Sequence, residues 1–291
     1  MKFSGWIIAC LLAWAGVAQA QLTAEVVLEQ EQYLPAETIN AAVKITNRSG
    51  QTLKFGDAPD WLTFSIEGRE GYVVSKEGEV PVLGEFKVGS SEVGTRKVNL
   101  APYFNLTRPG RYQVIATIHV KEWNQDITTK PRNFEVIHGN TIWMQDFGVP
   151  LPAGATNTAP EVRRYSLKQA NYLKTQPRLY LSITDGAESK VFKVFPIGPL
   201  TSFSNPEGQL DNESNLHVLY QNTGHTFLYT VVSPNGNVLL RQTYDYTKTR
   251  PHMIEDEKGR FSVGGGARHS MPDDLPPPSA GDSEKPRTTQ P

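Results

Sequence analysis

Residues 39–47, Ile-Asn-Ala-Ala-Val-Lys-Ile-Thr-Asn, alternate apolar residues with polar or small ones. Successive side chains of a β-strand point to opposite faces of a sheet, so this alternation predicts a strand with one buried face. Three further segments before residue 138 read as strands: 25–28, 62–66 and 112–120. Short strands separated by turns, with no helical stretch between them, predict a β-sandwich.

Two short motifs in this region resemble those of known sandwich domains. Tyr33-Leu34-Pro35-Ala36-Glu37, followed by residues 43–47, resembles the Tyr-x-Pro-Gly-Glu … Val-x-Ile-x-Asn opening of immunoglobulin-like domains in exported proteins, including macroglobulin-type and proteinase-inhibitor-type sandwiches. Ala36 stands where those families usually carry glycine. Residues 106–112, Leu-Thr-Arg-Pro-Gly-Arg-Tyr, resemble the entry to a late strand, with Pro-Gly as the turn and Tyr112 as a buried ring. The resemblance implies an immunoglobulin-like sandwich over residues 21–138, a fold used mostly for spacers or binding platforms.

Residues 161–266 carry a second set of strand-like segments, which predicts a second antiparallel β domain. These segments are residues 178–183, 191–195, 216–220, 227–232, 238–241 and 261–263. Residues 233–237, Ser-Pro-Asn-Gly-Asn, predict a hairpin turn between two of them. Residues 165–174 are expected to form one short helix.

An internal repeat runs through this second module. Four residues recur 45 positions later: Pro206, Asp211, Leu216 and Val218 as Pro251, Asp256, Phe261 and Val263. A period of about 40 to 45 residues is typical of β-propeller blades, and the pattern resembles blades of sialidase-like repeat families. The module is too short for the four or more blades of a closed propeller. Blade-like sheets within one compact β domain are therefore expected, with a ring completed by several chains as the alternative.

Two segments flank this module. Residues 139–160 are expected as a linker in which 141–149, with Trp143 and Phe147, pack between the modules, an aromatic binding patch being the alternative. Residues 150–160 are expected as an exposed loop. Residues 267–291, rich in proline, serine and charge, predict a disordered tail, with a proline-rich ligand for a partner groove as the alternative.

The first twenty residues predict a secretory signal peptide. Lys2 precedes an apolar run over residues 3–17, and Ala18-Gln19-Ala20 supplies a cleavage site. Cleavage after Ala20 predicts a secreted or periplasmic protein without a stable membrane anchor. The single cysteine, Cys10, lies in the apolar run, so disulfides, thiol catalysis and cysteine metal sites are not expected in the mature chain. A net charge of -1 disfavours a nucleic-acid partner.

The sequence offers no catalytic, cofactor-binding or metal-ligating set of residues. The histidines fit no zinc spacing; they are His119, His138, His217, His225, His252 and His269. His217 is expected to be an ordinary packed or surface histidine. Asp211 and Asp256 are expected in solvated hairpin turns, with calcium ligands or a glycosidase carboxylate pair as alternatives. Three residues begin glycosylation triplets: Asn47, Asn105 and Asn212.

We therefore expect a non-enzymatic extracytoplasmic binding or scaffold protein, whose loops and sheet edges recognise a protein or glycan of the cell envelope. The alternative from another class is a carbohydrate-active hydrolase that uses acidic residues of the second module. A third interpretation, an inhibitor of extracellular proteases, follows from the resemblance of the opening motif alone.

Overall fold

The computed structural model describes residues 22–69, 71–150, 161–201 and 205–275. These residues form several antiparallel sheets and no α-helix, which confirms the expected all-β fold class. The helical turns among them are two 3-10 turns, η1 (Ala101–Tyr103) and η2 (Lys121–Trp123). No helix within this part of the chain is long and apolar enough to cross a membrane. The segment expected as a signal peptide, residues 151–160 of the expected loop and residues 276–291 of the expected tail lie outside the described residues. The expectation of disorder is wrong for the start of the tail, because Ala267–His269 form a strand that pairs with residues 243–245.

Contacts divide the chain into two compact units. Of the described residues, the first comprises 22–29, 40–69, 71–103 and 112–133. The second comprises the described residues of 30–39, 104–111 and 134–275. The turn of the opening motif, residues 33–37, therefore makes its contacts as part of the second unit.

Three sheets form in the N-terminal half of the chain. One has the order β1 (Leu22–Leu28), β3 (Asn40–Asn47) and β7 (Val93–Asn99). Another has the order β2 (Gln32–Tyr33), β10 (Arg132–Val136), β8 (Gly110–Val120) and β5 (Leu62–Gly68), with β9 (Gln125–Thr128) also paired to β8. A short pair joins β4 (Leu53–Phe55) to β6 (Phe86–Val88). The four strands predicted in this region are all present.

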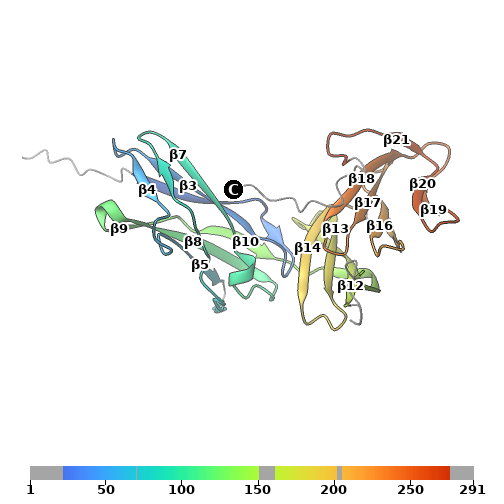
Figure 1. The fold of residues 1–291 in the computed structure, drawn as a ribbon, viewed down its shortest axis with the longest axis horizontal. Helices are drawn as coiled ribbons and strands as arrows, with labels where there is room; N and C mark the ends of the chain where they lie inside the picture. The colour runs from blue at the N-terminus through green and yellow to red at the C-terminus, as the bar shows by residue number, and fades with distance from the viewer. Residues whose placement is uncertain (1–21, 70, 151–160, 202–204, 276–291) are drawn as a thin grey trace, which may run out of the picture. The chain divides into compact units, whose positions relative to one another are not determined.

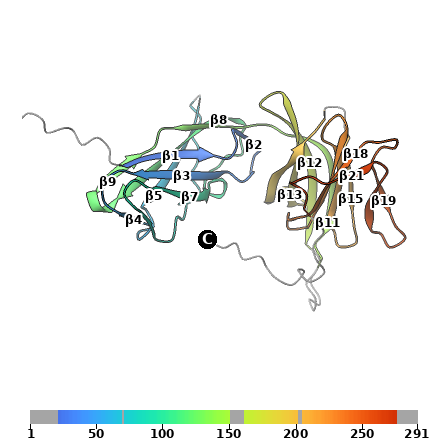
Figure 2. The same ribbon diagram turned by 90° about the horizontal axis from the view of Figure 1, so that it is seen from above.

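Strict alternation of burial shows why these residues form half-buried strands. Along β3 every second residue is buried, and Val43 and Ile45 are fully so. Val114, Ala116 and Ile118 of β8 are buried in the same way. Each sheet thus has one covered face, as the period-2 pattern predicts. Figures 1 and 2 show β3 and β7 in one layer and β5 and β8 in a second.

The second unit contains two larger sheets whose first four strands follow one another in chain order. The first has the order β11 (Asn140–Gly148), β12 (Val162–Tyr172), β13 (Gln176–Asp185) and β14 (Val191–Pro199). The second has the order β15 (Glu207–Leu210), β16 (Leu216–Gln221), β17 (Thr226–Val232), β18 (Val238–Asp245) and β21 (Ala267–His269). A separate hairpin joins β19 (His252–Glu255) to β20 (Phe261–Gly264).

The helix expected over residues 165–174 is wrong. These residues lie in and just beyond β12, which pairs with β13 from Arg163 to Tyr172. Tyr165, Ser166 and Leu167 are all buried, so both faces of the strand are covered and the period-2 signal is lost. Pairing on both sides, to β11 and β13, decides the conformation.

The stretch expected as linker contains strand β11. Phe147 is 5% exposed and stacks on Tyr165 with ring centroids 4.1 Å apart. Trp143 covers Gly208, where an added Cβ would lie 2.9 Å from the indole. Both aromatic residues pack within the second unit, whereas the sequence led us to expect packing between the modules.

Candidate functional site

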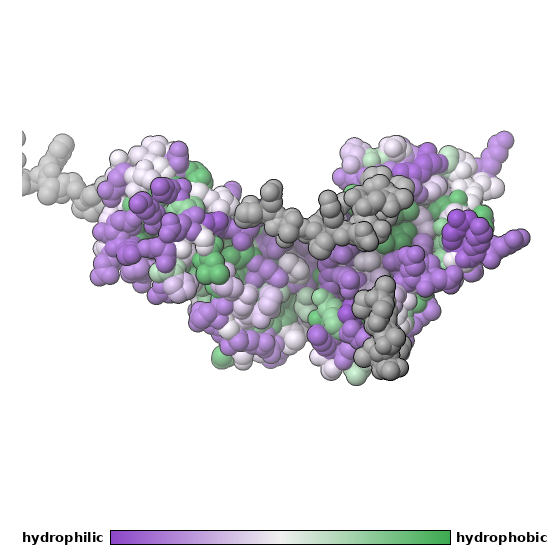
Figure 3. Space-filling view, in the orientation of Figure 1, coloured by the Kyte–Doolittle hydropathy of each residue, from purple (hydrophilic) through white to green (hydrophobic). Residues whose placement is uncertain are grey.

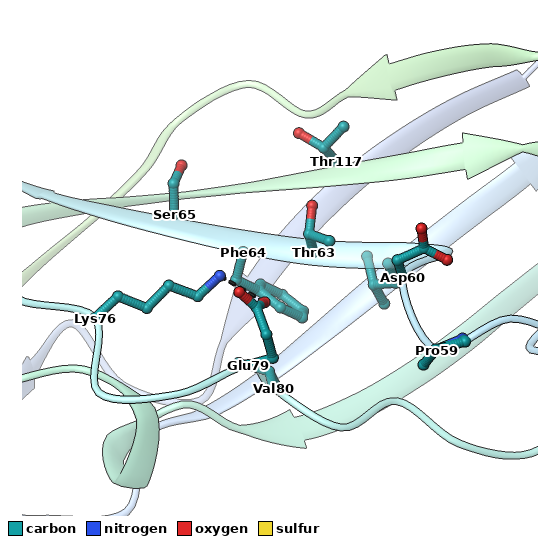
Figure 4. A pocket seen from close by; sticks show the side chains of 10 residues that line it. Pro59, Asp60, Thr63, Phe64, Ser65, Lys76, Glu79, Val80 and Thr117 are labelled. Carbon is teal, nitrogen blue, oxygen red and sulfur yellow. Dashed lines mark hydrogen bonds and ion pairs between the residues drawn. The ribbon is translucent and has the colours of Figure 1, made fainter.

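A groove with a volume of about 480 Å³ runs beside β5 in the first unit (Figure 4). Strand β5 ends its sheet: it pairs with β8 on one side, and no strand in the described part of the chain pairs with it on the other. The open side faces the loop of residues 71–85, and Val80 of this loop lines the groove. A sheet edge with a groove alongside it is a site where another polypeptide can add a strand.

The pairing of β5 fixes which of its backbone groups face the open side. His119 donates its backbone N–H to the Trp61 carbonyl, 2.8 Å away, directly before the strand. Phe64 lies opposite Ala116, whose backbone groups bond instead to Thr129 on the far side of β8. Hydrogen-bonded and non-hydrogen-bonded pairs alternate in an antiparallel ladder. The backbone groups of Leu62, Phe64 and Ile66 therefore point away from β8, toward the groove.

The side chains beside this edge differ between its two sides. In Figure 4 the hydroxyl groups of Thr63 and Ser65 lie on the opposite side of β5 from the Phe64 ring and Glu79. Glu79 accepts a hydrogen bond from Lys76 at 2.6 Å, so the two charges of this wall neutralise each other. The groove offers hydroxyl groups on one side and apolar surface on the other. This chemistry suits recognition by hydrogen bonding and apolar contact.

The loop that forms the far wall is tied to the unit at several points. The Trp61 indole donates to the Val82 carbonyl at 2.9 Å, and Glu77 N donates to the Tyr103 carbonyl at 2.9 Å. Val80 and Val82 are 5% and 4% exposed. The groove is thus bounded by fixed backbone.

The same loop carries the two most exposed large apolar side chains of the described residues, Val73 at 82% and Leu83 at 73%. Figure 3 shows that one face of the molecule is mainly hydrophilic, with apolar residues in smaller patches.

Asp211, a candidate from the sequence, organises a hairpin turn. One carboxylate oxygen accepts the backbone N–H groups of Glu213 and Asn215, at 2.9 and 2.8 Å. The other accepts from the Asn215 amide and from His217 Nε2, both at 3.0 Å. Burial acts to raise the pKa of Asp211, but the hydrogen bonds from His217 and Asn215 outweigh it and lower the pKa.

Asp256 makes the same turn in the second copy of the repeat. It accepts the backbone N–H groups of Lys258 and Arg260, both at 2.9 Å, and pairs with the Arg260 guanidinium. The hydrogen bonds from Arg260 lower the pKa of Asp256. The two turns are neighbours, since Asn212 Nδ2 donates to the Lys258 carbonyl at 3.4 Å. A glycosidase acid needs a raised pKa, and neither carboxyl group has one.

The sequence did not reveal the network around His217. Its ring is 7% exposed, with Nδ1 2.6 Å from the Tyr229 hydroxyl and Nε2 on Asp211. His217 is thus a packed histidine, which is one of its two expected placements. It is also linked to the buried Tyr229 hydroxyl and to the half-buried Asp211 carboxylate. Tyr229 comes into reach through the β16–β17 pairing, which no local motif specifies. No group of three or more potential metal-ligating side chains occurs among the described residues.

Comparison with protein-family models and with curated proteins gives no match to this sequence. One solved structure aligns with it, the sporulation control protein Spo0M from Bacillus subtilis. The alignment has a TM-score of 0.31 and 10% sequence identity, and it covers 69% of this chain and 79% of that chain. At this similarity we base no conclusion on the relationship, and the groove is interpreted from its own geometry.

Proposed function

We propose that this protein is a non-enzymatic binding or scaffold protein that takes an extended polypeptide segment along the open edge of β5. One observation carries the proposal: alternate backbone groups of β5 point into a groove beside which no described strand is paired. A strand added there would complete the ladder with main-chain hydrogen bonds.

The groove favours a polypeptide over a glycan as the partner. Donors and acceptors of Leu62, Phe64 and Ile66 recur at every second residue, and the edge of another β-strand has the same spacing. Successive side chains of a bound strand would alternate between the hydroxyl side and the apolar side of the groove.

Finer features of the fold and location belong to the same proposal. The opening motif and the layered sheets support an immunoglobulin-like sandwich. The strand order β11 to β14, and again β15 to β18, supports sheets related to propeller blades. We take residues 1–20 to be a secretory signal, so the partner would be a polypeptide of the cell envelope.

The test is selection of binding peptides from a random library, followed by affinity measurement on two variants. Ser65→Arg places a long side chain in the groove. Thr95→Arg makes the same exposed change on β7, an edge strand of the other sheet, and serves as the control. We expect S65R to weaken peptide binding about tenfold or more and T95R to leave it unchanged.

Amide hydrogen exchange gives a second readout that does not depend on folding of a variant. Without peptide, the amides of Thr63 and Ser65 should exchange slowly because they bond to β8, while those of Leu62 and Phe64 exchange faster. Bound peptide should slow the second set. Selected peptides that bind S65R normally, and that protect amides elsewhere, would show that the edge of β5 is not the binding site.

A further inference from the structure

A second pocket, with a volume of about 610 Å³, lies in the second unit and is independent of the groove proposed above. Its walls are rich in proline: Pro177, Pro196 and Pro199 come from β13 and β14. Arg241 of β18 contributes from the other large sheet. A mainly apolar pocket with a few polar groups is the usual form of a small-molecule site.

Arg241 lies on the core-facing side of its sheet. Strand pairing places Arg241 opposite Thr230, and Thr230 opposite Val218, so the three side chains share one face. Val218 is completely buried in the core cluster that this sheet contributes to the second unit. Tyr220, two residues further along β16, has the same orientation and is 1% exposed. A guanidinium group is therefore placed on an otherwise apolar inner face.

Three buried polar atoms on this face have no hydrogen-bond partner within the described residues: Arg241 Nε, Tyr220 Oη and Thr230 Oγ1. Buried polar groups in folded proteins are almost always paired. Gly198 lines the pocket, and a Cβ added to it would lie 2.6 Å from Tyr220 Oη. The hydroxyl group therefore lies behind the Gly198 backbone, and almost none of its surface is accessible. Burial raises the pKa of Tyr220 despite the nearby Arg241 charge, so the hydroxyl keeps its proton.

Several arginines of the second unit pair with carboxylates, and Arg241 does not. Arg164 pairs with Asp146 and Glu188, and Arg268 pairs with Asp274. No acidic partner of Arg241 occurs in the described part of the chain. An unpaired charge that is partly removed from water is unfavourable unless an anion compensates it. A guanidinium group matches a carboxylate.

We propose that this pocket binds the carboxylate of a small organic acid, held by Arg241, with its apolar body against the proline walls. The side-chain contacts of the two arginines that line the pocket favour a monoanion. The second arginine of the pocket, Arg178, already lies 3.5 Å over the Tyr172 ring and donates to Gln30 Oε1 at 3.2 Å. The Arg241 guanidinium group makes no such contact among the described residues, which suits one negative charge.

Benzoate and its neutral counterpart benzamide are suitable probes. In a thermal unfolding assay we expect about 10 mM benzoate to raise the melting temperature of the wild-type chain by about 3 °C, as a ligand at roughly ten times its Kd does. Benzamide should leave the melting temperature unchanged. Inorganic phosphate should also have no effect, since it lacks the apolar body.

Two variants and one control complete the test. Arg241→Met should abolish the benzoate shift, and it should fold, because it replaces an unpaired cation by an apolar side chain. Tyr220→Phe should leave benzoate binding unchanged in titration calorimetry, because the Tyr220 hydroxyl is not exposed to the pocket. Arg250→Met is the matched control, since Arg250 lies over the Phe227 ring and outside the pocket. Equal shifts with benzoate and benzamide, a benzoate shift that survives in R241M, no benzoate shift, or an equal response to phosphate would each overturn the proposal.

Discussion

Substitution of Glu37 by Gln should remove a pH dependence of stability that the wild-type chain has between about pH 4.5 and 7. Glu37 is 2% exposed. Its carboxylate accepts hydrogen bonds from the backbone N–H of Leu34 at 2.7 Å and from Gln30 Nε2 at 2.8 Å. Burial raises the pKa of Glu37 to about 7, against the opposing effects of these two hydrogen bonds and of the Arg178 charge.

The magnitude follows from the difference between the folded and unfolded pKa. The pKa moves from 4.5 to about 7, and each unit corresponds to about 1.4 kcal/mol, so the total is about 3 kcal/mol. Because the folded pKa is the higher one, the folded state binds the proton more tightly. The contribution is fully present below pH 4.5, and it is lost as the pH rises to about 7.

Urea unfolding of the wild type and of Glu37→Gln, at intervals from pH 4.5 to 8, measures this effect directly. The free energy of unfolding of the wild type, relative to that of E37Q, should fall by about 2–3 kcal/mol across the range. Glu67→Gln is the control, because Glu67 is an exposed residue of β5. Its difference from the wild type should stay nearly constant. A difference between wild type and E37Q that is flat, or that grows with pH, would refute the reasoning.

Two further changes act on single hydrogen-bonded turns. Ala36 has φ 62° at the third position of a turn closed by the Glu37 N to Leu34 O bond of 3.1 Å. Ala36→Gly should raise the free energy of unfolding by about 0.5–1 kcal/mol in urea titration, and a loss of stability would contradict this. Asn47 is buried, and its amide donates to three backbone carbonyls at 2.7, 2.9 and 3.2 Å. Asn47→Ala should cost about 2–3 kcal/mol in the same assay, and a loss below about 0.5 kcal/mol would show that these bonds contribute little.

The burial of Asn47 also bears on its glycosylation triplet. With its side chain inaccessible in the folded chain and fully bonded to backbone groups, this asparagine is a structural residue. The triplet motif indicates only which residues an enzyme could modify before folding. Accessibility depends on the sheet that covers the side chain, which the motif does not contain.

Local sequence patterns were sufficient to predict a strand where only one of its faces is buried. The alternation over residues 39–47 predicted β3, because apolar residues occupy every second position and these are the buried positions. The same signal fails for β12, where adjacent residues such as Tyr165 and Ser166 are both buried. The motif at residues 33–37 resembles the opening of a sandwich domain, but its packing depends on residues more than a hundred positions away, since Leu34 packs with Tyr180 and Val194.

The groove beside β5 could be predicted only in part. Alternation over residues 62–66 indicated the strand. Whether a strand lies at the edge or in the middle of a sheet depends on the order of strands, and this order is set by long-range pairing. The sequence therefore predicted that a sheet edge would be the binding site, but it did not predict which residues form that edge.

In the second unit, the partners of a charged side chain distinguish a structural residue from a residue that could bind a ligand. The sequence predicts Asp211 and Asp256 in hairpin turns, with calcium ligands or a carboxylate pair as alternatives. Each bonds to residues two to six positions further along, within its own hairpin. No sequence motif indicates a binding role for Arg241, and an arginine in a strand is usually exposed. Its inward placement next to Tyr220 emerges from the β16–β17–β18 register alone. A charge whose partners are local stabilises its turn, whereas a charge left without a partner on a buried face indicates where a ligand of opposite charge would bind.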